Sequence, residues 1–332
     1  MKVSEIRENT KKYNREQLTE VLVTAYKMLP KQKKEELDPY IIDLYAAMKE
    51  KKAASAAPAL PSDFHELKQE ILEFIDDAQN QYYFAPNRII PKQKRSRWRF
   101  IVKRYLKALF AIPTDDANAE EAGQLLLKLF NLLSQACAEY LFSTQDPFGA
   151  VGYEQNALYS KCAEYALKVN AYGEDTLKEV IRAATFSQVN YLSLNLQFEV
   201  SLINLLDANE RKHAIAVSKV LIQEQLNKRR NDAGRWDMRN FRIDENIQNL
   251  TNLIGMLHLT YGDFDGCLDD YWKCTSERDP ETALYILMND VIAAAGDDEM
   301  YAAAYENGVK KRKIKPREEL TNMYKEVKDK LK

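Results

Sequence analysis

Apolar residues recur at steps of three and four along most of this chain, the spacing that places them on one side of an α-helix. The first clear series begins just after Asn14 and Gln17, which have the spacing of a helix-capping pair, and it stops before Pro30. Its apolar members are Leu18, Val21, Leu22, Ala25 and Leu29. No segment alternates apolar and polar residues convincingly, and no Asn-Gly or Asp-Gly turn joins two apolar runs. The pattern therefore predicts an all-α protein.

The same periodicity predicts helices over the rest of the chain. Asp63 and Glu66 have the spacing of an N-cap and a third helical residue, and Pro316 stands at a suitable first-turn position for the last helix. The other expected helices cover about 33–48, 93–110, 119–142, 153–171, 174–184, 187–206, 209–229, 243–260, 264–276, 281–294 and 297–306. We expect them to form hairpins stacked as an irregular α-solenoid or bundle.

A short stretch rich in alanine and proline separates the first two helices from the others. Residues 51–61 read Lys-Lys-Ala-Ala-Ser-Ala-Ala-Pro-Ala-Leu-Pro, a composition typical of a linker. We therefore expect an N-terminal helical hairpin over 1–50, a linker over 51–61 and a larger, helical-repeat-like body over 62–332.

Two turns between helices in this body share a motif. Tyr172-Gly173 and Tyr261-Gly262 each end one expected helix and precede acidic residues that open the next, and Asp279-Pro280 opens a further helix in a similar way. Over about 247–295 the sequence resembles tetratricopeptide-type repeats, and the resemblance implies an α-solenoid. The chain from Lys11 through the Trp-Arg-Phe segment at 98–100 also resembles uncharacterised bacterial helical proteins, which implies no activity.

The composition is that of a folded protein in a reducing compartment. Of the 332 residues, 45% are apolar and 30% are charged, which argues against disorder. The N-terminal residues are too highly charged for a secretory signal, and the longest apolar stretch, 191–206, is interrupted by polar residues, so we expect no membrane span. The cysteines lack the spacing of a disulfide framework, so we expect buried free thiols in a cytoplasmic protein.

Positive charge is concentrated in one segment. Residues 78–114 contain nine Lys or Arg and no Asp or Glu, whereas the whole chain has 48 basic and 50 acidic residues. On the helix expected over 93–110, the aromatic and aliphatic residues fall mostly on one side and the cations roughly opposite, but Phe100 lies on the basic side. The candidate anion- or partner-binding residues are Arg95, Arg97, Arg99, Phe100, Lys103, Arg104 and Lys107.

Two interpretations of this segment remain open. Its cations can form a solvated face that pairs with acids nearby in the sequence, namely Asp76, Asp77, Asp115, Asp116, Glu120 and Glu121. Alternatively, they form a surface that binds an acidic protein, a nucleic acid or a phosphate-bearing ligand. Two further basic patches, over 228–242 and 310–315, would extend that surface into a groove if all three lay on one face. The formal net charge of −2 disfavours a dedicated nucleic-acid binder.

The chain carries no recognisable motif for catalysis, a cofactor or a metal. The three histidines are far apart, and Cys267 and Cys274 share a helical face without a Cys-x-x-Cys pair. Acids near 263–270 and 297–299 are expected to occupy first turns of helices rather than to bind calcium. An unrecognised active site would need a carboxylate that faces the interior, for which Glu154, Glu164 and Glu199 are candidates.

These observations favour a non-catalytic interaction or scaffold protein that binds a protein partner through a helical groove or through the basic helix. The alternative is a nucleic-acid-associated protein that uses the basic segment 88–107, and the third is an unrecognised enzyme. We expect no cofactor.

Overall fold

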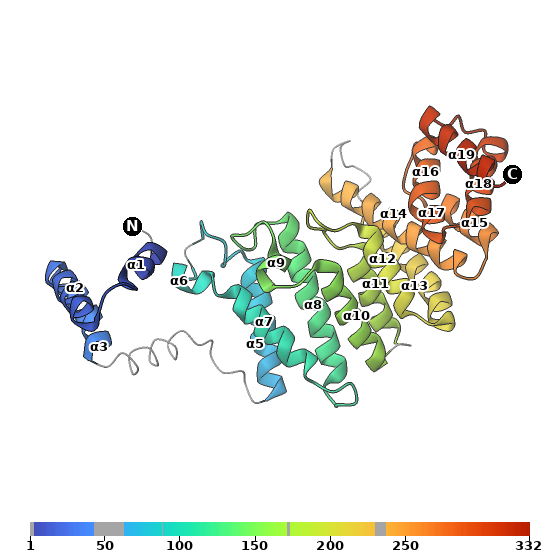
Figure 1. Cartoon of the computed structure of the whole chain (residues 1–332). Coiled ribbons are helices and arrows are strands. Elements are labelled where there is room, and N and C mark those ends of the chain that lie inside the picture. The colour runs from blue at the N-terminus through green and yellow to red at the C-terminus, as the bar shows by residue number, and fades with distance from the viewer. Residues whose placement is uncertain (1–2, 43–62, 88, 171–172, 230–236) are drawn as a thin grey trace. The chain divides into compact units, whose positions relative to one another are not determined.

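The computed structural model describes residues 3–42, 63–87, 89–170, 173–229 and 237–332 (Figure 1). Every regular element in these ranges is a helix and none is a strand, which confirms the predicted all-α fold. None of the helices described is both long and apolar enough to span a membrane. Contacts between residues divide the chain into two compact units, Met1–Ala59 and Leu60–Lys332. The linker predicted over 51–61 lies outside the described residues.

The described part of the first unit contains α1 (Val3–Thr10), α2 (Arg15–Met28) and α3 (Lys31–Ile42). The predicted cap of α2 is confirmed. Asn14 Oδ1 accepts a hydrogen bond from the Gln17 backbone N–H, and Gln17 Oε1 accepts one from the Asn14 N–H, each at 2.9 Å. No residue of α2 is buried by the described part of the chain, so its apolar stripe remains exposed.

The second unit is an array of helices that pack mainly against near neighbours in the sequence. Its first half contains α5 (Phe64–Gln79), α6 (Lys92–Arg95), α7 (Trp98–Phe110), α8 (Ala119–Ala138), α9 (Pro147–Val151), α10 (Gln155–Asn170), α11 (Glu174–Thr185) and α12 (Asn195–Leu205). Its second half contains α13 (Ala208–Asn227), α14 (Met238–Leu259), α15 (Phe264–Cys274), α16 (Pro280–Ile286), the π-helical segment η1 (Leu287–Ile292), α17 (Ala293–Ala295), α18 (Asp298–Glu306), the π-helical segment η2 (Asn307–Lys311) and α19 (Glu318–Lys330).

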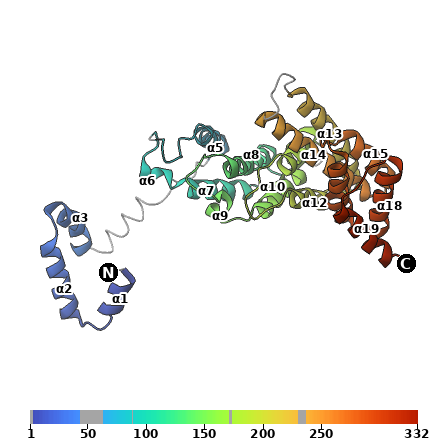
Figure 2. The ribbon, with the colours of Figure 1, turned by 90° about the horizontal axis from the view of Figure 1, so that it is seen from above.

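This unit is elongated. Figures 1 and 2 agree that α5 to α9 lie at one end, α10 to α13 in the middle and α15 to α19 at the other end. Two clusters of buried apolar side chains run through it, one from α5 to α14 and one from α14 to α19. The helix α14 belongs to both, because Leu257 packs in the first cluster and its neighbour Met256 packs in the second. The long helix α14 therefore joins the two halves of the core.

The helix predicted over 187–206 begins only at Asn195, and a buried glutamine explains the difference. Gln155 is fully buried, and its side-chain amide donates a hydrogen bond to the Gln188 carbonyl at 2.8 Å and accepts one from the Asn190 N–H at 2.9 Å. The Ser134 hydroxyl also donates to the Gln188 carbonyl, at 2.9 Å. These bonds satisfy non-helical backbone in the interior, so the apolar sequence there does not have to form a helix.

The C-terminal helices also depart from the predicted bounds. The helix predicted over 281–294 changes to π-helical geometry at η1, and the one predicted over 297–306 continues into η2. The last helix begins at Glu318 rather than at Pro316, with Arg317 as its N-cap. The predicted role of acids at helix starts is confirmed at Asp263 and Asp297, whose side chains accept capping hydrogen bonds from backbone N–H groups.

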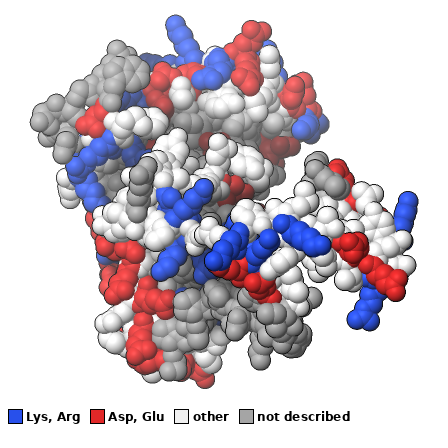
Figure 3. Space-filling model, turned by 90° about the vertical axis from the view of Figure 1, so that its left-hand side faces the viewer, with Lys and Arg blue, Asp and Glu red and all other residues white. Residues whose placement is uncertain are grey.

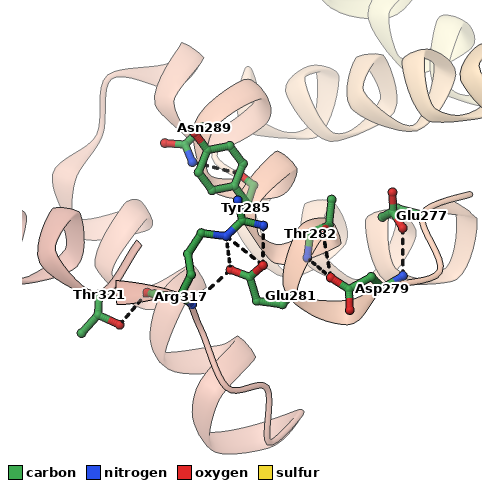
Figure 4. A network of polar contacts seen from close by, with 8 residues as sticks. All are labelled: Glu277, Asp279, Glu281, Thr282, Tyr285, Asn289, Arg317 and Thr321. Atoms are coloured by element: carbon green, nitrogen blue, oxygen red, sulfur yellow. Dashed lines mark hydrogen bonds and ion pairs between the residues drawn. The ribbon is translucent and has the colours of Figure 1, made fainter. Parts of the chain in front are cut away.

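Arg317 fastens the start of α19 to α16 (Figure 4). Its Nε donates to both carboxylate oxygens of Glu281, at 2.7 and 2.9 Å, and its backbone N–H donates to the same carboxylate at 3.1 Å. Its guanidinium also lies over the Tyr285 ring, 4.7 Å from the ring centre. Hydrogen bonding to Arg317 lowers the pKa of the Glu281 carboxyl. The ion pair therefore stabilises the fold above the usual pKa of glutamate, and this contribution is lost as the pH falls.

We predict that Glu281→Gln lowers the midpoint of thermal unfolding slightly at pH 7, by a few degrees at most because Arg317 is exposed. Because Glu281 gains a proton as the pH falls toward its lowered pKa, the difference between wild type and variant should be smaller at pH 3 than at pH 7. Circular dichroism melts at both pH values test this, with the exposed Glu326→Gln as the matched control. A difference that persists unchanged at pH 3 would show that the charge of Glu281 is not what stabilises the contact.

Candidate functional site

The basic segment forms α6 and α7 at one end of the second unit. One side of α7 is buried, and its anchor is Trp98, whose ring stacks on Phe142 with the ring centres 4.0 Å apart and the planes 12° from parallel. Val102, Tyr105 and Leu109 continue the buried side along the helix. Because this packing fixes the rotation of α7 about its axis, the opposite side of the helix faces the solvent.

Arg95 does not lie with the exposed cations. Its Nη1 donates hydrogen bonds to the backbone carbonyls of Asn87 at 2.8 Å and Phe84 at 3.3 Å, and to that of Ala85. The chain turns at Ser96 and Arg97, between the end of α6 and the start of α7. The prediction of a single helix over 93–110 is therefore wrong at this point. Arg95 does not share a helical face with the cations of α7.

Arg104 is also engaged within the fold. Its Nη2 forms an ion pair with Glu70 Oε1 at 2.5 Å, and the Tyr105 hydroxyl donates to the same oxygen at 2.9 Å. Glu70 belongs to α5, the helix that carries Asp76 and Asp77, but it was not among the acids predicted as partners. The Arg104 side chain is only 14% exposed, so this ion pair holds α7 against α5.

The other candidate binding residues are exposed to solvent. We define the basic surface as the exposed Lys and Arg residues of α6, of α7 and of the turn between them, together with the exposed Phe100: Lys92, Lys94, Arg97, Arg99, Phe100, Lys103 and Lys107. None of its cations forms an ion pair with another described residue. The Arg99 guanidinium lies over the Phe100 ring, 4.9 Å from its centre, and Phe100 is 51% exposed. Five of the seven predicted site residues therefore belong to this surface, and Arg95 and Arg104 do not.

Acidic side chains border the basic surface. Figure 3 is seen from the side of Figure 1 on which α5, α6 and α7 lie, and both basic and acidic side chains are exposed in this view. The neighbouring α5 exposes Glu66, Glu73 and Asp76. Burial raises the pKa of Asp77, and the negative charges of Asp76 and Glu73 raise it further. The positive surface therefore has an acidic edge.

The three basic patches of the sequence do not form one groove in the described structure. Residues 230–236 of the second patch lie outside the described residues, and Arg229 beside them pairs with Asp244 at 2.8 Å. In the third patch Lys310 pairs with Glu306 at 2.8 Å, and the Arg312 guanidinium lies over the Trp272 ring. This third patch is at the opposite end of the second unit from α6 and α7 (Figures 1 and 2).

The three candidate catalytic carboxylates have different environments. Glu154 caps the start of α10 by accepting from the backbone N–H groups of Asn156 and Ala157, and Glu164 pairs with Lys168 on the surface. Glu199 is only 1% exposed, and its Oε1 has no hydrogen-bond partner among the described residues. Burial, with a smaller contribution from Asp290, raises the pKa of Glu199 to about 8.

Glu199 is buried in the core and is not among the residues that line the neighbouring cleft. On the same helix, Val200, Ile203 and Asn204 line a cleft of about 280 Å³ with residues of α14, and Glu199 does not. The part of the chain that is described contains no group of three or more His, Cys, Asp or Glu residues that could hold a metal ion. Of the three candidate carboxylates, Glu199 is the one that faces the interior, because Glu154 and Glu164 are exposed.

Comparisons with known proteins identify no relative: no protein-family model, no curated protein and no solved structure matches this chain. The resemblance to tetratricopeptide-type repeats therefore stays a prediction.

We predict that Glu199→Gln stabilises the protein in alkaline solution. Protonated Glu199 stabilises the fold fully below the usual glutamate pKa, and this contribution is lost as the pH rises toward about 8. Gln cannot ionise but retains a polar amide, so at pH 8 we expect a gain on the order of 2 kcal/mol. Urea unfolding of both proteins between pH 4 and 9 measures this, with Glu164→Gln as the control. Parallel stability curves for wild type and Glu199→Gln would contradict it.

Proposed function

We propose that the second unit is a non-catalytic docking module that binds an acidic segment of a protein partner through the basic surface. The observation that supports this best is that Lys92, Lys94, Arg97, Arg99, Lys103 and Lys107 are exposed without ion-pair partners among the described residues. Cations held close together repel one another, and an anionic partner would relieve that repulsion.

The rigidity of the surface supports a recognition role. The Trp98–Phe142 stack and the Arg104–Glu70 ion pair hold α7 in place. The Arg95 side chain holds the segment before α6 by donating hydrogen bonds to backbone carbonyls of that segment. Binding to a surface that is already ordered costs less conformational entropy than binding to one that must be ordered. A half-exposed aromatic ring among the cations adds an apolar contact, as protein interfaces commonly do.

The size and border of the surface favour a short acidic peptide segment over a nucleic acid. The exposed cations occupy α6 and α7, and α7 spans about 20 Å at 1.5 Å per residue. A longer polyanion that continued past this surface would meet the acids of α5, and the third basic patch lies too far away to extend the track. A short acidic segment of a protein can contact the cations of the basic surface without reaching the acids of α5. We place this interaction in the cytoplasm, where the free thiols of the chain would persist.

We predict that the triple variant Arg97→Glu, Arg99→Glu, Lys103→Glu loses at least tenfold in affinity for an acidic peptide. The probe is a fluorescently labelled peptide of alternating Glu and Leu, followed by anisotropy with the full chain across a salt series. The control variant is Lys311→Glu, Lys315→Glu, Lys330→Glu, which changes the net charge equally at exposed positions at the other end of the unit. It should bind as wild type does.

Equal losses in the two triple variants would contradict the proposal, because the peptide would then respond to net charge alone. A single-stranded RNA and a duplex DNA of matched charge are measured in parallel. If either binds more tightly than the peptide and loses binding in the first triple variant, the surface is a nucleic-acid site instead.

A variant at Phe100 distinguishes binding at a specific site from attraction to the positive charge alone. We predict that Phe100→Ser leaves the thermal midpoint nearly unchanged, because the ring is half exposed, but weakens binding of the Glu-Leu peptide severalfold. A peptide of alternating Glu and Ser offers no apolar side chain, so its affinity should be the same for both proteins. If the two peptides respond alike, Phe100 makes no specific contact with the bound peptide.

A further inference from the structure

A histidine bridges two carboxylates where α14 turns into α15. His258 Nδ1 lies 2.7 Å from Asp263 Oδ2, and His258 Nε2 lies 2.8 Å from Asp270 Oδ2. Lys219 of α13 approaches the same oxygen of Asp270, with Nζ at 2.6 Å. The side chains of His258 and Asp270 are 14% and 15% exposed, so this contact is mostly shielded from water. The network therefore connects α13, α14 and α15.

The geometry selects one protonation state of the imidazole. A neutral imidazole has one N–H donor and one acceptor nitrogen, whereas an ionised carboxylate only accepts. With both ring nitrogens on carboxylate oxygens, the neutral ring can hydrogen-bond to one partner and would face the other with a lone pair. The imidazolium ring has two N–H donors and satisfies both carboxylates.

The surroundings of Asp263 and Asp270 lower the pKa of both carboxyl groups and so favour the ionised form. A hydrogen bond from the Gly266 backbone N–H and a second from His258 lower the pKa of Asp263. Burial acts to raise the pKa of Asp270, but hydrogen bonds from Lys219 and His258 outweigh it and leave the pKa lowered. With His258 protonated, the two cations and two anions balance, and without that proton the cluster carries a net negative charge.

The other titratable groups around this network do not change charge in the range in which histidine titrates. On α15, burial raises the pKa of Cys267 to about 12 and raises that of Cys274, so both thiols stay neutral. At the turn, burial raises the pKa of Tyr261, over whose ring Lys212 of α13 lies at 5.5 Å. Lys273 of α15 adds a further basic side chain to this part of the fold.

The network around His258 lies at the end of α14, beside residues that pack in both core clusters, so a change in its hydrogen bonds would affect how these clusters are joined. His258 is next to Leu257 and close to Met256, which pack in the two different core clusters. Asp263 is also the N-cap of α15, because its Oδ1 accepts from the Gly266 N–H at 3.0 Å. The carboxylate that holds the histidine therefore also fixes the first turn of the helix that begins the C-terminal half of the core.

We propose that His258 is a pH-sensitive latch, whose imidazolium ties α15 to α14 and whose deprotonation loosens the α14–α15 turn. Because the closed latch needs the second proton on the His258 ring, acid favours the closed form and a rising pH favours the open form. The latch concerns the fold of the C-terminal half and does not depend on what the basic surface binds.

Hydrogen exchange of the full chain, measured by mass spectrometry at pH 5.5, 6.5, 7.5 and 8.5 and corrected for the intrinsic rate, tests the latch. We expect protection of peptides covering 256–275 to fall about tenfold from pH 5.5 to 8.5, while peptides from α8 and α10 serve as internal references. His258→Gln keeps a side chain that can hydrogen-bond to one carboxylate but cannot titrate, and its protection should not vary with pH. His65→Gln, an exposed histidine on α5, should behave as wild type.

Constant protection in the wild type, or an undiminished pH dependence in His258→Gln, would overturn the proposal. If His258→Gln does not fold, Asp270→Asn replaces it, because removing one carboxylate leaves the neutral ring with a single partner and should reduce the pH dependence. Long-range proton–nitrogen correlation spectra of the wild-type imidazole give an independent answer. Two protonated ring nitrogens for His258 at pH 6 support the latch, and a neutral ring at that pH refutes it.

Discussion

The burial of one side of α7 determines which cations of the basic segment are exposed to solvent. Trp98 stacks on Phe142 and is followed along the helix by apolar residues that join the first core cluster. Because that side must be buried, the cations on the other side must be exposed, whatever their mutual repulsion costs. The two cations that are not on the exposed side, Arg95 and Arg104, are satisfied by backbone carbonyls and by Glu70. The basic surface is thus a consequence of core packing.

The second unit carries its core along an elongated array, and α14 makes that core continuous. Its buried residues belong to both apolar clusters, so the helices after it depend on how firmly α14 holds them. The Arg317–Glu281 ion pair joins the start of α19 to α16, and the network around His258 joins α15 to α14 and α13. The Glu281 carboxylate gives the C-terminal half a contact that weakens in acid, and the buried Glu199 of α12 makes the first half sensitive to alkaline pH.

Apolar periodicity was enough to predict an all-α protein and most helix starts, because helix caps and amphipathic faces are local properties of the sequence. The prediction failed where contacts between residues far apart in the sequence determine the backbone conformation or the direction of a side chain. Gln155 holds 188–190 out of a helix from a distant element, and Arg95 leaves its expected face by binding carbonyls of an earlier turn. Five of the seven members of the basic surface were predictable from the amphipathic pattern of the segment 93–110. The His258 network was not, because Lys219, His258 and Asp270 come together only through the packing of three helices.

Lysine acetylation footprinting of the full chain with a bound Glu-Leu peptide tests most directly whether the basic surface is the binding site. Lys92, Lys94, Lys103 and Lys107 are exposed and unpaired among the described residues, so each should react readily in the free protein. The account predicts that saturating peptide protects these lysines and leaves Lys311 and Lys315 unchanged. Protection that is equal across all exposed lysines, or that is confined to the far end of the second unit, would contradict it.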